Sequence, residues 1–485
     1  MRTNREIRRR RFRDGIGGKD LDQIIQWAHG VNDAVNGFVW GPFMICLLTG
    51  VGIYLTVRLG FLQIFRFRYI FKNTIGKSFA KSAGAGNITS SQAGMASICA
   101  VLGNGNIAGV ATAIAIGGPG AMFWMWVAAF FGMATKFAEI TLGVYFREKR
   151  PDGTYAGGAM YYIEKGLHQK WLAVLFSIMV IAAYFIMGAV VNTNTICLAV
   201  ETNLGVRPVV TGALMAVLTG IVILGGLKRI GEVCEYLTPI MADIYIAAGI
   251  AIVLFNVKEV PGAFAEMVRC AFTPVSAAGG FAGAGVMKIV SIGMSRGLFT
   301  NEAGMGSSPM IHSSAQVTHP VQQGMWGAVE VFLDTIVVAT ITGLAIVISG
   351  LWTSGITGAE LTMRAFDLTL PGNIGSTIVM FSAFLFGYSC LVTSHCYCER
   401  AADYLFGAKS VIPVRILWLL FIVAGAGSGL DFIWSLADTA NGVMAVPNLI
   451  ALILLSPVVI RLTREYFGGV DKNRRAEKGG RRKRK

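Results

Sequence analysis

The chain has 485 residues, of which 54% are hydrophobic and only 14% are charged. Apolar runs of about 20 residues recur along its whole length, which excludes a soluble enzyme and indicates an all-α polytopic membrane protein. The net charge of +15 does not point to a nucleic-acid partner, because the basic residues gather in the tails and in alternate loops.

The two ends of the chain are both basic. Residues 1–36 are expected to form a basic tail that contains Arg8–Arg11, followed by a short interfacial helix. The loop 58–81, which contains six Lys or Arg residues, and the basic tail 463–485 are expected in the cytoplasm.

Two of the apolar segments contain polar, glycine-rich interruptions. In the segment 91–116, Gly103 and Gly105 lie mid-span, and each costs about 1 kcal/mol relative to alanine in a helix. A break in the helix is expected there, and hydrocarbon offers no partner for the N–H and C=O groups that it frees. Such breaks usually line a binding cavity. A second insert, 295–307, interrupts the later segment 283–310.

Eleven membrane spans are predicted in all. They cover residues 38–57, 91–116, 121–146, 171–200, 208–227, 236–256, 283–310, 323–350, 374–399, 412–429 and 433–461. Without the first span, the transmembrane domain of residues 37–462 divides into two sets of five, 88–256 and 283–461. Because five is odd, the two sets run in opposite directions, which is the inverted-repeat plan of LeuT-type transporters. This plan predicts a binding site at mid-membrane, between the two breaks.

The number of spans also predicts the orientation of the chain. With a cytoplasmic C-terminus, eleven spans place the N-terminus outside the cell, although the first twenty residues contain eight Lys or Arg. The expected location is the inner (plasma) membrane, with the lipid bilayer as partner and no obligate protein partner.

Six segments contain longer motifs, at residues 105–114, 117–126, 132–139, 296–307, 334–340 and 437–448. In this order they resemble the alanine or glycine:cation symporter family. The resemblance implies a LeuT-type fold and secondary active uptake of a small neutral amino acid, usually coupled to Na⁺ and sometimes to H⁺. It implies no covalent chemistry, so the chain is not expected to be an enzyme.

The candidate substrate-binding residues lie at the two breaks and on two further spans. They are Asn104, Gly105, Asn106, Asn192, Phe299, Thr300, Cys390 and Ser394. Three of these places depart from the pattern of the family, which generally has Thr between Gly103 and Gly105, Gln at 192, and Thr and Trp at 390 and 394. The loss of a Trp at Ser394 favours a larger polar substrate such as glutamine, asparagine or serine beside alanine and glycine.

For the coupling cation, analogy with LeuT-type folds indicates backbone at Gly103 and the hydroxyls of Thr393 and Ser394. Asp243 is a further candidate, because carboxylates within membrane spans tend to be functional. Proton coupling on the same fold remains an alternative, as does a solute sensor or passive conductor. No metal site is expected at His395–Cys398, since cysteines two apart on a helix point in different directions.

Four charged residues within spans have a simpler interpretation as structural ion pairs. Lys136 and Glu139 are three apart on one helix face and are expected to pair with each other. Glu330 and Asp334 are four apart and are expected to pair with Arg296, although they could also serve protons.

Overall fold

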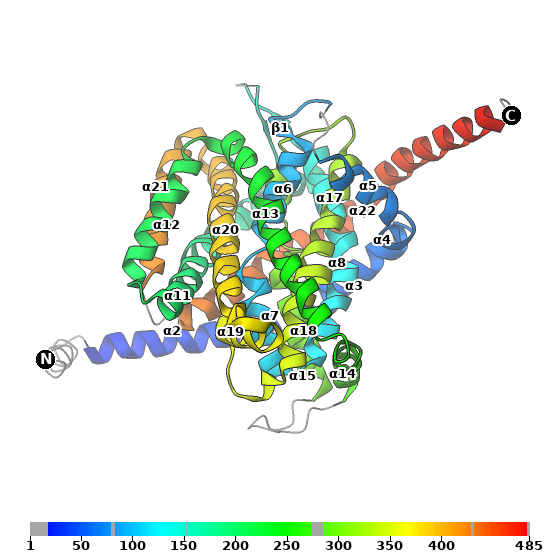
Figure 1. Cartoon of the computed structure of the whole chain (residues 1–485). Helices are drawn as coiled ribbons and strands as arrows, with labels where there is room; N and C mark the ends of the chain where they lie inside the picture. Colours follow the sequence, from blue (N-terminus) through cyan, green and yellow to red (C-terminus); the bar gives the residue numbers. More distant parts are fainter. Residues whose placement is uncertain (1–17, 79–82, 152, 274–284, 428–430, 483–485) are drawn as a thin grey trace, which may run out of the picture.

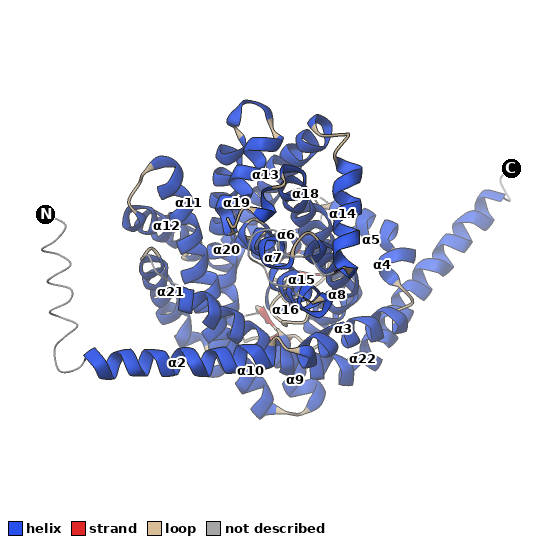
Figure 2. Ribbon diagram, turned by 90° about the horizontal axis from the view of Figure 1, so that it is seen from below, coloured by secondary structure: helices blue, strands red, loops and turns tan. Residues whose placement is uncertain are grey.

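The chain folds into a helical bundle, seen in a computed structural model that describes residues 18–78, 83–151, 153–273, 285–427 and 431–482. Most helices run along one common direction, and the four short helices of the two breaks lie near the middle of the bundle when it is viewed from one end (Figures 1 and 2). Strand β1 and the end of the C-terminal helix both lie toward the same end of the bundle, at the top of Figure 1.

Two helices precede the first break. Helix α2 (Gly18–Val39) and helix α3 (Pro42–Arg58) meet at Gly41, and the short helices α4 (Leu62–Phe65) and α5 (Phe67–Asn73) follow. The expected interfacial helix is longer than predicted, and it packs along the C-terminal helix: Asn32 donates through Nδ2 to Ser435 Oγ at 2.7 Å. The predicted N-terminal tail before residue 18 lies outside the described residues.

The first predicted break is confirmed. Helix α6 (Ser90–Val101) begins with a capping box between Thr89 and Gln92 and ends before a 3₁₀ turn, η2 (Asn104–Asn106). Helix α7 (Ala108–Gly117) then continues at an angle of 47° to α6. The glycines therefore interrupt the helix where their low helix propensity predicted it.

The remaining helices of the first half follow in chain order. They are α8 (Gly120–Tyr145), α9 (Ala159–Leu167), α10 (Lys170–Tyr184), the π-helical turn η3 (Phe185–Val191), α11 (Asn192–Leu204), α12 (Pro208–Ile223), α13 (Gly226–Phe255) and α14 (Val260–Phe272). The π-helical turn joins α10 and α11 into one long span, Lys170–Leu204.

The second break begins later than the sequence predicted. Helix α15 (Val286–Asn301) remains helical through most of the polar insert and ends only at Glu302, whose φ of 54° is left-handed. Gly304 and Gly306 also have positive φ, and helix α16 (Pro309–His312) starts after them. The backbone unwinds where glycine makes left-handed conformations accessible, and not where the insert merely becomes polar.

The second half completes the bundle. Its helices are α17 (Pro320–Val331), the π-helical turn η4 (Phe332–Ala339), α18 (Thr340–Ser349), α19 (Gly358–Thr369), α20 (Gly375–Phe406), α21 (Val411–Gly425) and α22 (Asp431–Arg482). Helix α22 continues to Arg482, so the described part of the basic tail is helical and extends away from the bundle (Figure 1).

Four strands of two residues each depart from the all-α prediction. β1 (Ile88–Thr89) pairs in parallel with β4 (Ala315–Gln316), and β2 (Glu148–Lys149) pairs antiparallel with β3 (Tyr155–Ala156). The first pair ties the start of α6 to the chain that follows α16, so both broken segments are joined at one end of the bundle.

Length and composition identify eight helices in the described residues that could cross a membrane, or nine when the bent pair α6 and α7 is counted as one span. The two further predicted spans correspond to α12 and α15, which have 16 residues each. A helix of that length rises only about 24 Å, less than the hydrocarbon core of a bilayer.

Candidate binding site between the two helix breaks

A small cavity of about 30 Å³ lies between the two breaks. Its walls come from α6 and η2, from the π-helical turn η3 with the start of α11, from α15 and from α20. Seven of the eight residues predicted to bind substrate line it: Asn104, Gly105, Asn192, Phe299, Thr300, Cys390 and Ser394. Gly103, predicted for the cation, lines it as well.

At the first break, α20 packs directly against the unwound backbone. The thiol Sγ of Cys390 lies 3.3 Å from the carbonyl oxygen of Ala100 and 3.6 Å from that of Cys99, and Ser389 Oγ donates to the same Cys99 oxygen at 3.0 Å. A Cβ added at Gly103 would lie 2.7 Å from Cys390 Sγ. Gly103 is therefore required for the close approach of α20 to the end of α6, in addition to breaking the helix.

Two asparagines meet at the wall of the cavity. Asn104 Nδ2 lies 3.4 Å from Asn192 Oδ1, and Asn192 Nδ2 donates to the carbonyls of Met187 and Gly188 at 3.2 Å each. The other end of the Asn104 amide is different, because its buried Oδ1 has no hydrogen-bond partner among the described residues. Since buried polar atoms are nearly always paired, an acceptor of this kind suits a bound donor.

Three predicted site residues lie outside the cavity lining. Asn106 instead donates to Asp334 Oδ1 at 2.7 Å, so the structure gives it a packing partner and not a place at the cavity. Thr393 is buried one position from Ser394 and donates to Ser389 O at 2.7 Å, because adjacent residues on a helix face different directions. Asp243 lies on the exposed outer face of α13, away from both breaks.

Sequence reasoning missed one acidic residue of the lining. Glu302 ends α15, is 2% exposed and accepts a hydrogen bond from Ser307 Oγ at 2.6 Å. A signal was available in the sequence, because Glu302 is the one carboxylate within the glycine-rich insert 295–307. Met187 and Val191 of η3 also line the cavity and carried no such signal.

The second break is held by charged side chains of neighbouring helices. Lys136 Nζ donates to the carbonyl oxygen of Asn301 at 2.6 Å, at the end of α15, and lies 3.7 Å from Glu330 Oε2. Glu139 accepts from the N–H of Gly306 at 3.1 Å. Lys136 and Glu330 are both fully buried, so this network replaces water around the unwound segment.

These contacts correct the ion pairs expected from sequence. In the described part of the chain, Lys136 pairs with Glu330 and not with Glu139. Arg296 pairs with Asp438 of α22 at 3.0 Å, and not with Glu330 or Asp334. Spacing along one helix could not reveal these partners, which lie on other helices.

Polar contacts of neighbouring helices lie near the lining of the cavity. On one side, the guanidinium of Arg296, held by Asp438, lies 5.6 Å from the ring centre of Phe299, which lines the cavity. On the other side, Ser97 of α6 donates to Glu330 Oε2 at 3.0 Å, and His312 of α16 hydrogen-bonds to Glu330 Oε1.

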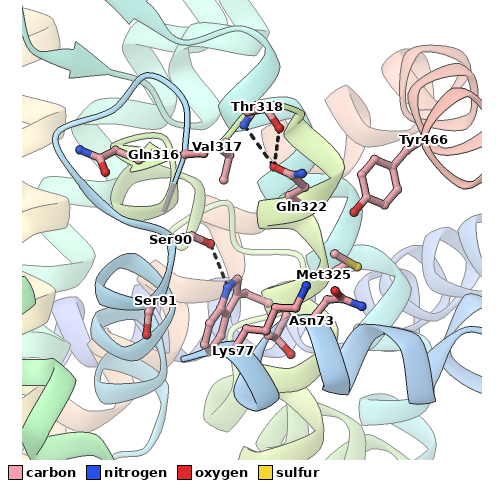
Figure 3. Close-up of a pocket in the computed structure, with 13 residues that line it drawn as sticks. Asn73, Lys77, Ser90, Ser91, Gln316, Val317, Thr318, Gln322, Met325 and Tyr466 are labelled. Atoms are coloured by element: carbon pink, nitrogen blue, oxygen red, sulfur yellow. Dashed lines mark hydrogen bonds between the residues drawn. The ribbon is translucent and has the colours of Figure 1, made fainter. Parts of the chain in front are cut away.

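A larger cavity of about 190 Å³ opens at the end of the bundle that contains β1 (Figure 3). Lys77, Gln322 and Tyr466 approach it from three different elements, and Ser90 at the start of α6 accepts a hydrogen bond from the indole of Trp326 at 3.2 Å. This contact attaches the first broken helix to α17 beneath the larger cavity.

The bundle and its paired breaks define a multi-pass membrane protein with the fold of LeuT-type transporters. The solved structure of MhsT in complex with L-phenylalanine matches it with a TM-score of 0.56 over 78% of this chain and 90% of that one, at 16% identity. A match at this level of identity shows a shared fold.

The family follows from sequence comparison. Residues 25–479 match the sodium:alanine symporter family, and the chain therefore belongs to that family. Sodium/alanine symporter AgcS of Methanococcus maripaludis is 43% identical over 442 residues, covering 90% of this chain and 96% of the relative. An uncharacterized transporter of Haemophilus influenzae is 42% identical over 437 residues, covering 90% and 95%. A Bacillus subtilis protein described as a probable sodium/glutamine symporter, GlnT, is 37% identical over 451 residues, covering 92% and 91%.

Proposed function

We propose that this protein is a secondary active symporter that imports a small neutral amino acid together with Na⁺. The observation that carries the proposal is the cavity between the two breaks, which combines unwound backbone with the unpaired Oδ1 of Asn104 and the carboxylate of Glu302. A zwitterion needs acceptors for its ammonium and donors for its carboxylate. Asn104 and Glu302 offer acceptors, and the N–H groups near the start of α7 offer donors at the positive end of a helix dipole.

Oxygen ligands for Na⁺ are available at the first break, beside the thiol of Cys390. The carbonyl oxygens of Cys99, Ala100 and Leu102 all lie within 3.9 Å of one point, the Sγ of Cys390. Hard cations prefer oxygen ligands, so backbone around Gly103 with the hydroxyl of Ser394 would hold the ion, and Thr393 would join only after turning away from Ser389. A bound Na⁺ would supply positive charge beside the substrate carboxylate and couple its binding to the ion gradient.

The lining also bears on the substrate class. Asn104, Asn192 and Ser394 present amide and hydroxyl groups, and a site built to hydrogen-bond a substrate rejects analogues that leave those groups unpaired. Alanine, glycine and serine are the proposed substrates, because the larger asparagine and glutamine would need more room than the cavity of about 30 Å³ offers. The related AgcS and GlnT are named for alanine and glutamine, which supports the same class.

Proton coupling is a second candidate, and one observation favours it. Glu139 Oε2 is buried and has no hydrogen-bond partner among the described residues, although the same carboxylate holds the second break through Gly306. A carboxylate with one free oxygen beside an unwound helix segment could take up a proton. Asp243, the earlier candidate, is exposed on the outside of the bundle and is less suited to this role.

Counterflow in proteoliposomes tests the function directly. We expect labelled alanine to accumulate when unlabelled alanine is inside and Na⁺ is present, and this exchange to fall at least tenfold when choline replaces Na⁺. Exchange that does not depend on Na⁺ but responds to an imposed pH gradient would indicate coupling to protons instead. Flux without any exchange would favour a passive conductor.

The proposed orientation has the C-terminus in the cytoplasm and the N-terminus outside, in the inner (plasma) membrane. It rests on the basic loop 58–81 and the basic end of α22, which follow the positive-inside rule. Labelling of a cysteine introduced at position 3 tests it: modification from the cytoplasmic side alone would contradict the proposed eleven spans.

A further inference from the structure

Ser394 is a small side chain in the wall of the cavity, yet the cavity beside it measures only about 30 Å³. Some other side chain must therefore occupy the space next to it. Directly behind the wall lies Trp418 of α21, one of the largest fully buried side chains in the described residues.

Gly188 marks the place where the indole and the cavity wall meet. A Cβ added at Gly188 would lie 2.8 Å from Cη2 of Trp418 and 2.9 Å from Cβ of Ser394. Real Cβ atoms do not approach other atoms so closely, so the glycine leaves space that the indole edge and the serine share. Trp418 thus reaches Ser394 from behind, across a position without a side chain.

The indole is fixed in this position. Its Nε1 donates to the carbonyl oxygen of Leu391 at 3.0 Å, one helical turn before Ser394 and His395. Its ring packs against Phe185, with centroids 5.6 Å apart, and against the edge of His395 at 5.8 Å. A buried aromatic ring held by a hydrogen bond and ring contacts forms a rigid wall.

Trp418 contacts the cavity indirectly, through the π-helical turn η3. Gly188 lies between Met187 and Val191, which line the cavity, and its carbonyl accepts from Asn192 Nδ2 at 3.2 Å. Moving the indole or filling position 188 would therefore shift the side chains and the amide that face a substrate.

We propose that Trp418, acting across Gly188, is the specificity-determining residue that limits the side-chain length of the transported amino acid. The inference rests on the proposed function and deepens it: glycine, alanine and serine fit in front of the indole, while glutamine and leucine require it to recede.

Competition with labelled alanine in counterflow tests the proposal on Trp418→Phe and Trp418→Leu. We expect glutamine to gain about tenfold relative to alanine in the leucine variant and less in the phenylalanine variant, because a recessed wall admits the longer side chain. Gly188→Ala should act in the opposite direction and favour glycine over alanine.

The matched control is Trp124→Phe. The indole of Trp124 also donates to a backbone oxygen, that of Ala271 at 3.1 Å, but its ring packs against Phe123 and Phe272, neither of which lines the cavity. We expect its ratio of glutamine to alanine to equal that of the unmodified protein. An unchanged ratio in both Trp418 variants would overturn the proposal, as would loss of alanine exchange in both variants while Trp124→Phe remains active.

Thermal stabilisation by the same amino acids in detergent separates this proposal from the proposed transport. If no exchange is seen, but glutamine stabilises Trp418→Leu and not the unmodified protein, the size limit stands and the transport assignment fails. If no amino acid stabilises either protein, both are overturned.

Discussion

The two helix breaks differ in how their unwound backbone is held. At the first break, neutral groups of α20 contact the end of α6: the thiol of Cys390 and the hydroxyl of Ser389. At the second, the charged groups of Lys136 and Glu139 bind the backbone of Asn301 and Gly306.

Charge-assisted hydrogen bonds are roughly twice as strong as neutral ones, so the second break is the rigid half of the site. The first break retains the unpaired Oδ1 of Asn104 and has weaker attachments to α20, so it is the half that should respond to a ligand. Substitutions at the second break should therefore change stability most, and those at the first break should change transport most.

The largest effect is expected for Lys136→Met. It removes the donor to Asn301 O and leaves the buried Glu330 without its lysine partner, which typically costs 3–5 kcal/mol. Thermal unfolding in detergent measures this loss. Lys136→Met with Glu330→Gln should recover part of it, whereas Lys165→Met, at a half-exposed pair with Glu148, should cost at most about 1 kcal/mol. Equal losses of stability in Lys136→Met and Lys165→Met would contradict the conclusion that buried charges make the second break the rigid one.

Gly103→Ala should reduce transport at least tenfold with a smaller effect on unfolding. The added Cβ would lie 2.7 Å from Cys390 Sγ, so either α20 or the end of α6 must shift. Cys390→Ala in the same protein should restore part of the activity by removing the sulfur. Gly109→Ala is the matched control, because an added Cβ there meets no atom within 4 Å, and its transport should be unchanged.

Substitution of the two asparagines of the first break, Asn104 and Asn106, should have different effects: one on substrate binding and the other on stability. Asn104→Ala is expected to raise KM for alanine about tenfold while leaving the unfolding temperature nearly unchanged, because Asn104 Oδ1 has no protein partner among the described residues. Asn106→Ala should instead lower stability by about 1–3 kcal/mol, because Oδ1 of the buried Asp334 loses the donor Asn106 and only Oδ2 keeps one, from Thr335. Transport and unfolding measurements on both variants check this. If Asn104→Ala lowered stability and Asn106→Ala raised KM, Asn106 would be the binding residue and Asn104 the packing residue.

The smallest effect on stability is expected for Asp438→Asn. The pair of Arg296 and Asp438 is about one-fifth exposed on each side, and partly solvated pairs of this kind contribute about 0–1 kcal/mol. Its loss should leave the unfolding temperature within experimental error. A decrease in unfolding temperature as large as that of Lys136→Met would show that the pair of Arg296 and Asp438 stabilises the bundle as much as the second break does.

Local sequence patterns were enough to predict the class of the protein and much of its architecture. Apolar runs, the two glycine-rich interruptions and the family motifs predicted a membrane-embedded helical bundle with a site between two breaks. Local physics suffices for this, because a membrane span needs a run of apolar residues and a break needs glycine. For the same reason Gly103 and Asn104 could be named before the fold was known.

The contacts between side chains could be identified only from the folded chain. In the structure, Lys136 pairs with Glu330 instead of Glu139, and Glu302 joins the lining of the cavity. Asn106, Thr393 and Asp243 lie outside that lining, and Trp418 lies behind Ser394. Each of these outcomes depends on the crossing of helices far apart in the chain. Helix periodicity determines the face on which a residue lies, but the partner of that face is set by how the whole bundle packs.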